Sequence, residues 1–256
     1  MRIATWNVNS VRARLPLVVG WLGEALPDVL LLQEIKCETD AFPAMEFKAL
    51  GYDVHVLGQK SYNGVAIASL HKIEDTLEGL PDTGDDAQAR YLEATIKGLR
   101  IASLYLPNGN PVGTEKYAYK LAWMARLKRR ADELLRNERP VILGGDFNII
   151  PTEFDVYDAK DWEQDALYLP QSRATFRDIL HLGYTDIFRA LHPFERAYSF
   201  WDYQNGAWQQ DKGLRIDHFL LSPEAVDCVR SCHIDRSPRD KEKASDHTPV
   251  VVEVGE

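Results

Sequence analysis

Carboxylates, amides and an imidazole stand in this sequence where apolar runs end, and such side chains can bind a metal cation or move a proton. In residues 141–151, VILGGDFNIIP, an apolar run and a glycine pair lead to Asp146 and Asn148. The run predicts a strand covered on both faces, and residues two apart in a strand point the same way. For this fragment alone a turn is the simpler interpretation, because Asp and Asn beside glycine and before Pro151 commonly form one.

The same arrangement recurs at the ends of other strand-like segments. The polar residues at these ends are Asn7, Asn9, Glu34, Tyr105, Asn108, Asp217, Asp246 and His247. Taken singly, each could cap a turn, pack as a half-buried aromatic or form a satisfied buried pair. Because carboxylates and amides dominate the whole set, we expect a single site assembled at the rim of the sheets.

Strands and helices must bring these ends together, and their patterns can be read along the chain. Besides the run at 141, strand-like runs occupy residues 2–8, 28–34, 52–58, 63–69, 91–96, 99–107, 198–203, 214–222 and 249–254. Apolar residues at helical spacing predict helices over 15–26 and 114–136, and another is expected near 172–182. Lys97-Gly98 predicts a tight turn between two strands. Consecutive strands with occasional helices favour packed sheets with helices outside, an α/β fold.

The composition is that of a globular protein. We expect the 256 residues to form one domain, 1–256, and 45% hydrophobic with 27% charged residues argues against disorder. The N-terminus enters a strand-like pattern directly, and no run approaches the roughly 18 apolar residues of a membrane span, so a cytoplasmic location is expected. Cys37, Cys228 and Cys232 lack paired CxxC spacing, so reduced thiols are expected.

The net charge of −9 ordinarily argues against a nucleic-acid partner. It does not exclude one, because acidic residues around a metal site raise that count. A divalent cation then reverses the local field that a phosphate meets.

With these residues in view, the sequence resembles the exonuclease III family of abasic-site endonucleases, within the endonuclease/exonuclease/phosphatase superfamily. The segments that carry the resemblance appear in order as TWNVNSVRAR, PDVLLLQEIK, GYDVHVLGQKSYNGVAI, YLPNG, LGGDFNI, LRIDHFLLS and SDHTPV. They span nearly the whole chain, and such an ordered set is far more specific than a lone GDFN. The resemblance implies a four-layered α/β sandwich with two central mixed, largely antiparallel sheets flanked by helices.

The resemblance also implies a role for each candidate residue. The metal ligands would be Glu34, with Asn7 beside it and Asp246 completing the shell. The residues around the reacting phosphate would be Asp146 and Asn148 on the attacking water, His247 on the phosphate or nucleophile, Asp217 orienting that imidazole, and Tyr105 and Asn108 at the phosphate. Arg90 matches an arginine that the family uses on the DNA backbone.

Phosphodiester hydrolysis needs these residue types because a nucleophile must approach an anion and a poor alkoxide must leave. Mg2+ prefers oxygen ligands and binds through one or two carboxylates, which suits Glu34; Mn2+ could substitute, and zinc is less natural without a His/Cys cluster. Asp246 and His247 are sequence neighbours, a poor arrangement for one to hold the other, so Asp217 is the expected partner of the imidazole. The sequence leaves open whether Asp146 or His247 is the general base.

Cleavage at a missing base requires a small apolar pocket for the extruded sugar. The corresponding positions are Phe200, Leu214 and Ile216, whose alternative role is core packing, and a one-residue shift would exchange Phe200 for Trp201. Cations near the motifs, namely Arg12, Arg14, Lys60, Arg90 and Arg215, could contact the DNA backbone. Pro111 stands where certain relatives place a basic intercalating side chain.

We therefore expect a Mg2+-dependent DNA repair nuclease that cuts duplex DNA 5′ to abasic sites and removes 3′ blocking groups or nucleotides. Its partner would be double-stranded DNA with abasic sites or 3′ ends. We expect no association with a membrane, and we take a monomer as the default oligomeric state. Two alternatives stay open. One is a superfamily phosphoesterase acting on small phosphate esters, and the other is a noncatalytic nucleic-acid-binding relative.

Overall fold

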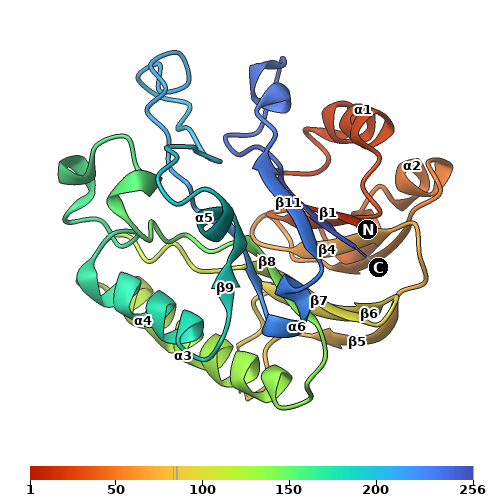
Figure 1. Ribbon diagram of the computed structural model, residues 1–256. Coiled ribbons are helices and arrows are strands. Elements are labelled where there is room, and N and C mark those ends of the chain that lie inside the picture. Colours follow the sequence, from red (N-terminus) through yellow and green to blue (C-terminus); the bar gives the residue numbers. More distant parts are fainter. Residues whose placement is uncertain (83, 85, 256) are drawn as a thin grey trace.

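Two mixed sheets of six strands each form the centre of the computed structural model, which describes every residue except 83, 85 and 256 (Figure 1). The first sheet has the strand order β11-β12-β1-β2-β4-β3, with bounds β1 Arg2–Asn7, β2 Val29–Gln33, β3 Asp53–Leu57, β4 Val65–Ser69, β11 Val229–Ile234 and β12 Val250–Val254. The second has the order β5-β6-β7-β8-β10-β9, with bounds β5 Glu74–Glu78, β6 Tyr91–Ile96, β7 Leu99–Tyr105, β8 Val141–Asp146, β9 Thr185–Asp186 and β10 Asp217–Leu221. Only β1–β2 and β7–β8 are parallel among these pairs.

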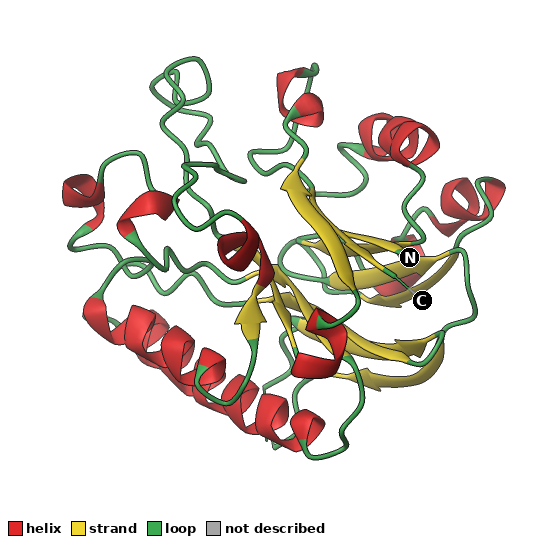
Figure 2. Cartoon of the chain, viewed as in Figure 1, coloured by secondary structure: helices red, strands yellow, loops and turns green. Residues whose placement is uncertain are grey.

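The helices lie outside the two sheets (Figure 2). Their bounds are α1 Leu15–Ala25, α2 Ala44–Ala49, α3 Glu115–Leu135, α4 Pro170–Leu180, α5 Ile187–Leu191 and α6 Pro223–Val226. One apolar cluster joins the facing sheets, a second lies under α3 and α4, and a third under α1 and α2. The expected four-layered sandwich is therefore confirmed. None of the described helices combines the length and apolar character that crossing a membrane would need.

The strand register explains why the polar ends meet. In the second sheet Tyr105 pairs with Asp146 across β7–β8, and Asp146 pairs with Asp217 across β8–β10. In the first sheet, β1 and β2 run parallel and end together, which brings Asn7 beside the residue before Glu34. Side-chain room between the sheets is scarce here, since a Cβ on Gly144 would lie 2.7 Å from Leu31 and 2.5 Å from Phe219. Gly144 thus lets the sheets approach just before Asp146.

Two strand predictions were wrong. Residues 198–203 do not form a strand, because Phe200 makes only isolated bridges to Leu214 and His247. These bridges lie at the rim, outside the hydrogen-bonded strand pairs of the sheets. For the same reason the strand expected over 214–222 begins only at Asp217. The tight turn at Lys97-Gly98 is present, with positive φ at both residues. Elements that the sequence patterns did not indicate include β5, β11 and the short helices α2, α5 and α6.

Candidate active site

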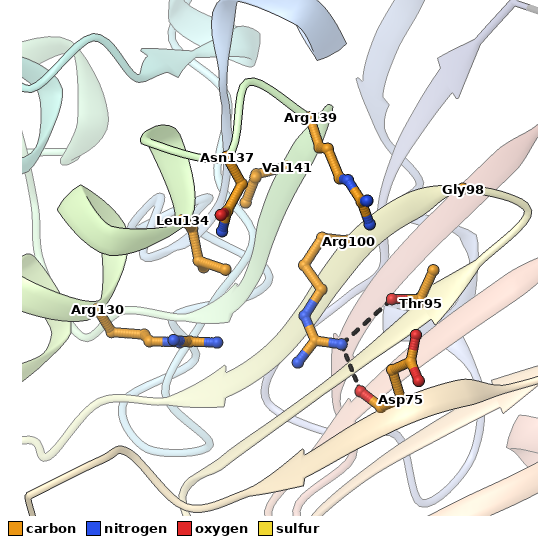
Figure 3. Close-up of a pocket in the computed structure, with 9 residues that line it drawn as sticks. All are labelled: Asp75, Thr95, Gly98, Arg100, Arg130, Leu134, Asn137, Arg139 and Val141. Atoms are coloured by element: carbon orange, nitrogen blue, oxygen red, sulfur yellow. Dashed lines mark hydrogen bonds between the residues drawn. The ribbon is translucent and has the colours of Figure 1, made fainter.

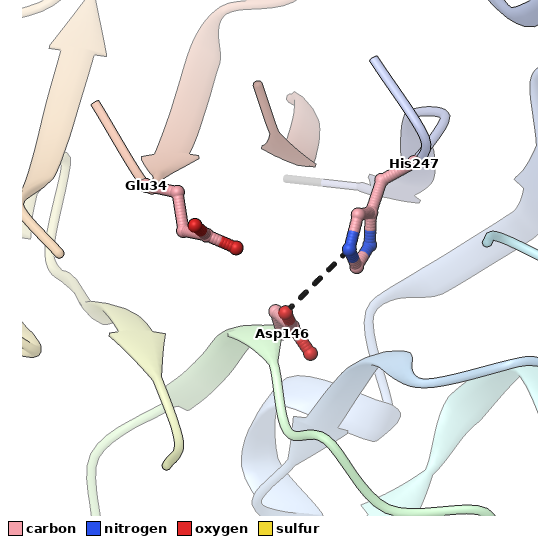
Figure 4. A group of neighbouring side chains, drawn as sticks. All are labelled: Glu34, Asp146 and His247. Atoms are coloured by element: carbon pink, nitrogen blue, oxygen red, sulfur yellow. Dashed lines mark ion pairs between the residues drawn. The ribbon is translucent and has the colours of Figure 1, made fainter. Parts of the chain in front are cut away.

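Glu34, Asp146 and His247 converge from three separate segments at the rim shared by the two sheets (Figure 4). One ligand atom from each lies within 4.8 Å of the others. The Nε2 atom of His247 is 3.7 Å from Asp146 Oδ2. These three residues are the one group of potential metal-binding His, Cys, Asp and Glu found among the described residues. The arrangement gathers negative charge in a buried place, where a cation would be strongly bound.

Asn7 and Lys36 hold the carboxylate of Glu34. The Asn7 Nδ2 atom donates to Glu34 Oε1 at 2.9 Å and to Asp146 Oδ2 at 3.0 Å, so one buried amide links the two acids. Lys36 Nζ lies 2.9 Å from Glu34 Oε2. Burial alone would raise the pKa of Glu34, but these hydrogen bonds and the lysine charge hold it below the ordinary value. The sequence analysis did not single out Lys36, although it is two residues from Glu34.

Asp217 orients the imidazole of His247. Its Oδ2 atom lies 2.8 Å from His247 Nδ1 and also accepts a hydrogen bond from Ser199 Oγ at 2.6 Å. Burial alone would lower the pKa of His247, but the carboxylates of Asp217 and Asp146 raise it to about 10. The ring is therefore held as a cation between two acids, with Nε2 turned toward Asp146.

Asp146 is crowded by like charge. Burial raises its pKa to about 7; His247 opposes this rise, and the Asp217 carboxylate adds to it. Its Oδ1 atom accepts the backbone N–H of Asn148 at 2.9 Å. Asp217 Oδ1 is buried without a hydrogen-bond partner among the described residues. The acids thus exceed the cations of the chain that contact them, as expected of a site completed by a divalent ion.

Lys120 is a site residue that the sequence analysis missed. It is fully buried, and its Nζ donates to the backbone oxygens of Asn108 at 2.9 Å and Asn148 at 2.7 Å. Asn108 Nδ2 in turn lies 3.3 Å from Asn148 Oδ1. Burial lowers the pKa of Lys120 to about 7, against the opposing pull of Asp146 and Asp165. The signal was a lysine at a core position of the amphipathic helix, four residues before the buried Met124.

Arg90 and Asn108 line a groove of about 550 Å3 beside the acids, together with Gln59, Tyr62, Asn63, Gln88, Pro107, Gly109, Asn110, Lys116 and Tyr119. The guanidinium of Arg90 lies 4.7 Å from the centre of the Tyr105 ring and donates to the Tyr105 backbone oxygen at 3.2 Å. Burial raises the pKa of the Tyr105 hydroxyl well above its ordinary value, and Glu34 and Asp146 add to the rise. The phenol therefore stays protonated and can donate a hydrogen bond.

The expected pocket wall lies next to His247. Phe200 packs edge-on against the imidazole, with ring centres 4.9 Å apart, and bridges to Leu214. Trp201 points instead into a separate cluster with Tyr198 and Ala207, so the register with Phe200 at the site holds. Leu214 and Ile216 are only 1% and 2% exposed, packed in an apolar cluster with Val156, Leu167 and Tyr168. This burial is also what core packing would give, so the role of these residues as a pocket wall stays a prediction.

Two further candidates, a predicted metal ligand and one of the cations near the motifs, are not in the group of three. Asp246 is outside the group of three and accepts a hydrogen bond from Asn9 Nδ2 at 3.0 Å. Arg215, taken as a candidate backbone contact, is fully buried and bound to Asp155 and Asp186. That interpretation was wrong, because a guanidinium enclosed by two carboxylates offers nothing to a phosphate outside.

A second cavity, about 450 Å3, lies at the start of β7 and β8, away from the strand ends that carry the acids (Figure 3). Arg100, Arg130 and Arg139 line it with Asp75 and Thr95. Arg100 and Arg130 both pair with the buried carboxylate of Glu93, so most of this positive charge is neutralised internally.

Comparisons with known proteins agree with this fold. The model of the endonuclease/exonuclease/phosphatase family matches residues 4–247. Exodeoxyribonuclease III of Haemophilus influenzae is 31% identical over 99% of both chains. An AP endonuclease from Archaeoglobus fulgidus has 38% identity and a TM-score of 0.96, covering 99% of both chains.

A 3′-5′ exonuclease from Neisseria meningitidis has 39% identity and a TM-score of 0.97, covering 100% of both chains. The Neisseria protein, there described as a 3′ phosphatase and carrying an Asp-to-Asn substitution, has also been solved bound to a product DNA hairpin, with the same identity and coverage.

Proposed function

The chain belongs to the endonuclease/exonuclease/phosphatase family, and from that premise we propose that it is a Mg2+-dependent DNA repair nuclease of the exonuclease III type. It hydrolyses the phosphodiester 5′ to abasic sites and removes 3′ blocking groups and nucleotides from duplex DNA. The observation that carries this proposal is the convergence of Glu34, Asp146 and His247 within 4.8 Å at a buried rim.

The donor set fits a hard divalent cation. Glu34 and Asp146 offer carboxylate oxygens, and the unpaired buried Oδ1 of Asp217 adds to the negative charge. Oxygen ligands of this kind suit Mg2+, with Mn2+ as a substitute. We propose that Glu34 holds the ion, with Asn7 beside it and Asp246 farther out. An ion held there would supply Lewis-acid polarisation of the phosphate and stabilisation of the leaving oxygen.

We propose a separate catalytic or binding role for each of the other candidate residues. We propose that Asp146, with Asn148 beside it, orients the attacking water and accepts its proton, which makes the aspartate rather than His247 the general base. His247 serves as the cation on the phosphate, because Asp217 and Asp146 keep it charged. Tyr105 and Asn108 donate hydrogen bonds to the phosphate oxygens, and Arg90 contacts the neighbouring DNA backbone. Positioned acid-base groups of this type typically contribute about 100-fold to 10,000-fold.

The closed pocket wall predicts an order among the activities. A 3′-phosphate has nothing beyond the scissile phosphate, whereas an abasic sugar or a terminal nucleotide must be placed against Phe200, Leu214 and Ile216. Because Leu214 and Ile216 are packed against Leu167 and Tyr168, these side chains must part first. We therefore expect 3′-phosphate removal to be faster than cleavage at an abasic site.

One substrate panel tests the proposal against both alternatives. It compares four substrates, each with Mg2+ and with EDTA: a duplex with one abasic analogue, a 3′-recessed duplex, a 3′-phosphate duplex and a small phosphate ester. Mg2+-dependent cleavage of the duplexes, fastest at the 3′-phosphate, supports the nuclease. Turnover of the small ester alone would select the small-molecule phosphoesterase, and DNA binding without Mg2+-dependent cleavage would select the noncatalytic relative.

Three further expectations belong to this proposal. The chain acts as one domain over residues 1–256, since a single apolar cluster joins its two sheets. It works as a monomer on double-stranded DNA, and its location is cytoplasmic. These three points stay predictions.

A further inference from the structure

A cavity of about 440 Å3 beside the candidate active site is lined by positive charge. Its lining residues are Ala13, Arg14, Tyr203, Arg239, Lys241, Lys243 and Ala244. Four of these seven are cations and none is an acid, although the whole chain carries a net charge of −9. We call this cavity the basic pocket. Positive charge gathered against the overall balance of a protein indicates an anionic ligand more strongly than scattered surface lysines do.

The basic pocket shares its wall with the active site. Arg14 Nη2 donates to the hydroxyl of Tyr203 at 3.0 Å, and that hydroxyl donates to the backbone oxygen of Ala244 at 3.0 Å. Ala244 precedes His247 by three residues. Arg14 also donates to the backbone oxygen of Asn9, whose side chain donates to Asp246. Contacts between protein atoms therefore run without a break from the pocket to the catalytic histidine.

The cations of the basic pocket are not neutralised from within. No described carboxylate forms an ion pair with Arg14, Arg239, Lys241 or Lys243, whereas Arg100, Arg130 and Arg215 all bind buried acids. Arg239 is only 8% exposed, and its Nε atom, like that of Arg14, is buried without a hydrogen-bond partner among the described residues. A buried Nε–H without an acceptor is costly, so a ligand with strong acceptor oxygens fits this position.

Tyr203 and Trp208 stiffen this arrangement. The guanidinium of Arg239 lies 5.5 Å from the centre of each ring, and Arg239 Nη2 donates to the backbone oxygen of Trp201 at 3.1 Å. The arginine is thus fixed in place, while Lys241 and Lys243 are exposed at the opening. A fixed buried cation with exposed cations at its rim is suited to a phosphate that is part of a chain.

We propose that the basic pocket binds a DNA backbone phosphate flanking the one that is hydrolysed. This inference rests on the proposed function and extends it, because it assigns a phosphate subsite to residues outside the metal and acid-base set. It also explains how a protein of net negative charge holds duplex DNA close to a cluster of acids. The subsite fixes the strand, so that the scissile phosphate reaches Glu34, Asp146 and His247.

The test uses the full chain with Lys241→Glu and Lys243→Glu together, since both side chains are exposed and their replacement leaves the core untouched. The matched control is Lys48→Glu with Lys97→Glu, two exposed lysines elsewhere that give the same change in net charge. KM for a 3′-phosphate duplex should rise at least 10-fold in the pocket variant. The slope of log kcat/KM against log salt should flatten by roughly 0.9 for each phosphate that the variant no longer neutralises. The control should change neither quantity.

A second measurement locates the phosphate. Duplexes carrying one uncharged methylphosphonate at successive backbone positions should show one position, close to the scissile phosphate, where binding to the wild type weakens. In the pocket variant, the same modification should have a smaller effect, because two of the four cations that would attract this phosphate are absent. The inference is overturned if both double variants behave alike, or if the methylphosphonate penalty is undiminished in the pocket variant. Failure of the wild type to cleave any duplex would sink the proposed function instead.

Discussion

Two clusters of buried charge include the neighbours of Ile216 in the sequence, Arg215 in one and Asp217 in the other. They differ in whether their acids are balanced by cations of the chain. Arg215 donates to Asp155 at 2.6 Å and to the two oxygens of Asp186 at 2.9 and 2.7 Å, and Arg189 also binds Asp155. Burial would raise the pKa of both carboxyls, but the arginine charges hold each below its ordinary value. We call this set the arginine network.

The second cluster consists of Glu34, Asp146, Asp217 and His247 in the candidate active site, and we call it the acidic site. In it, Asp146 and Asp217 share the one imidazole of His247, and burial raises the pKa of Asp146 to about 7. The acids of the arginine network are matched by cations of the chain itself, whereas those of the acidic site are not. A balanced cluster can only stabilise structure, since its partners are already in place. An unbalanced one keeps binding capacity for something from outside, which is how buried charge marks a functional site.

The largest effect should come from the acidic site and fall on activity. Replacing Asp146 by Asn or His247 by Ala should lower kcat on a 3′-phosphate duplex by about 100-fold to 10,000-fold, because each removes a group that acts on the water or the phosphate. Asp146→Asn also removes a like charge from a crowded site, so the free energy of unfolding should not fall. Turnover within a few-fold of wild type, in protein shown to be folded by circular dichroism, would refute these roles.

Breaking the arginine network should instead lower stability. Arg215→Met leaves the carboxylates of Asp155 and Asp186 buried without their main partner, which typically costs about 3–5 kcal/mol. Urea denaturation should show that loss of unfolding free energy. The folded fraction should keep its metal dependence, because Glu34 and Asp146 are untouched. A normal unfolding free energy would contradict the distinction between the two clusters.

This contrast also explains what the sequence could and could not predict. Residues at strand ends were predictable, because apolar runs end at Glu34 and Asp146 and another begins at Asp217, and packed sheets follow from the succession of such runs. The pairing of buried charges was not predictable from the sequence. Arg215 stands two residues before Asp217 in the same motif, and nothing in the local sequence shows that its side chain points into the core. Its partner Asp155 is 60 residues away along the chain.

A pH titration separates the two clusters by their histidines. Burial, reinforced by Arg215, lowers the pKa of His218 to about 4. The unfolded chain therefore binds the proton more readily, so the neutral ring contributes stability that is full above about pH 6.5 and is lost as pH falls toward 4. The loss between pH 7.5 and pH 5 amounts to about 2 kcal/mol by linkage.

The ring of His218 accepts a hydrogen bond from Arg215 Nη1 at 2.9 Å and donates one to the backbone oxygen of Ile149 at 2.9 Å. The measurement is the unfolding free energy of the wild type and His218→Gln at several pH values, because glutamine can keep both hydrogen bonds without titrating. The difference between the two proteins should shrink by that amount toward pH 5. Parallel curves would show that His218 is not held neutral. His247, whose pKa is raised, cannot produce this acid-side loss.

The smallest effect concerns Lys120, a buried cation that belongs to neither cluster. Its ammonium is held by the backbone oxygens of Asn108 and Asn148, so its removal should disturb the site more than the fold. Lys120→Met keeps the length of the side chain and ends the cost of burying a charge, which offsets the two carbonyls left unpaired. We expect kcat to fall about 10-fold, which corresponds to about 1.4 kcal/mol, with the unfolding free energy changed by less than that.

Met124→Leu is the matched control for Lys120→Met, since Met124 is equally buried one turn along the same helix and has no polar partner. It should leave kcat unchanged. If Lys120→Met destabilised the chain but kept normal turnover, Lys120 would act as a structural charge like Arg215. If Lys120→Met slowed turnover without lowering the unfolding free energy, a buried charge would serve the site by positioning the backbone alone. Pairing with carboxylates would then not be the only criterion that separates functional from structural charge.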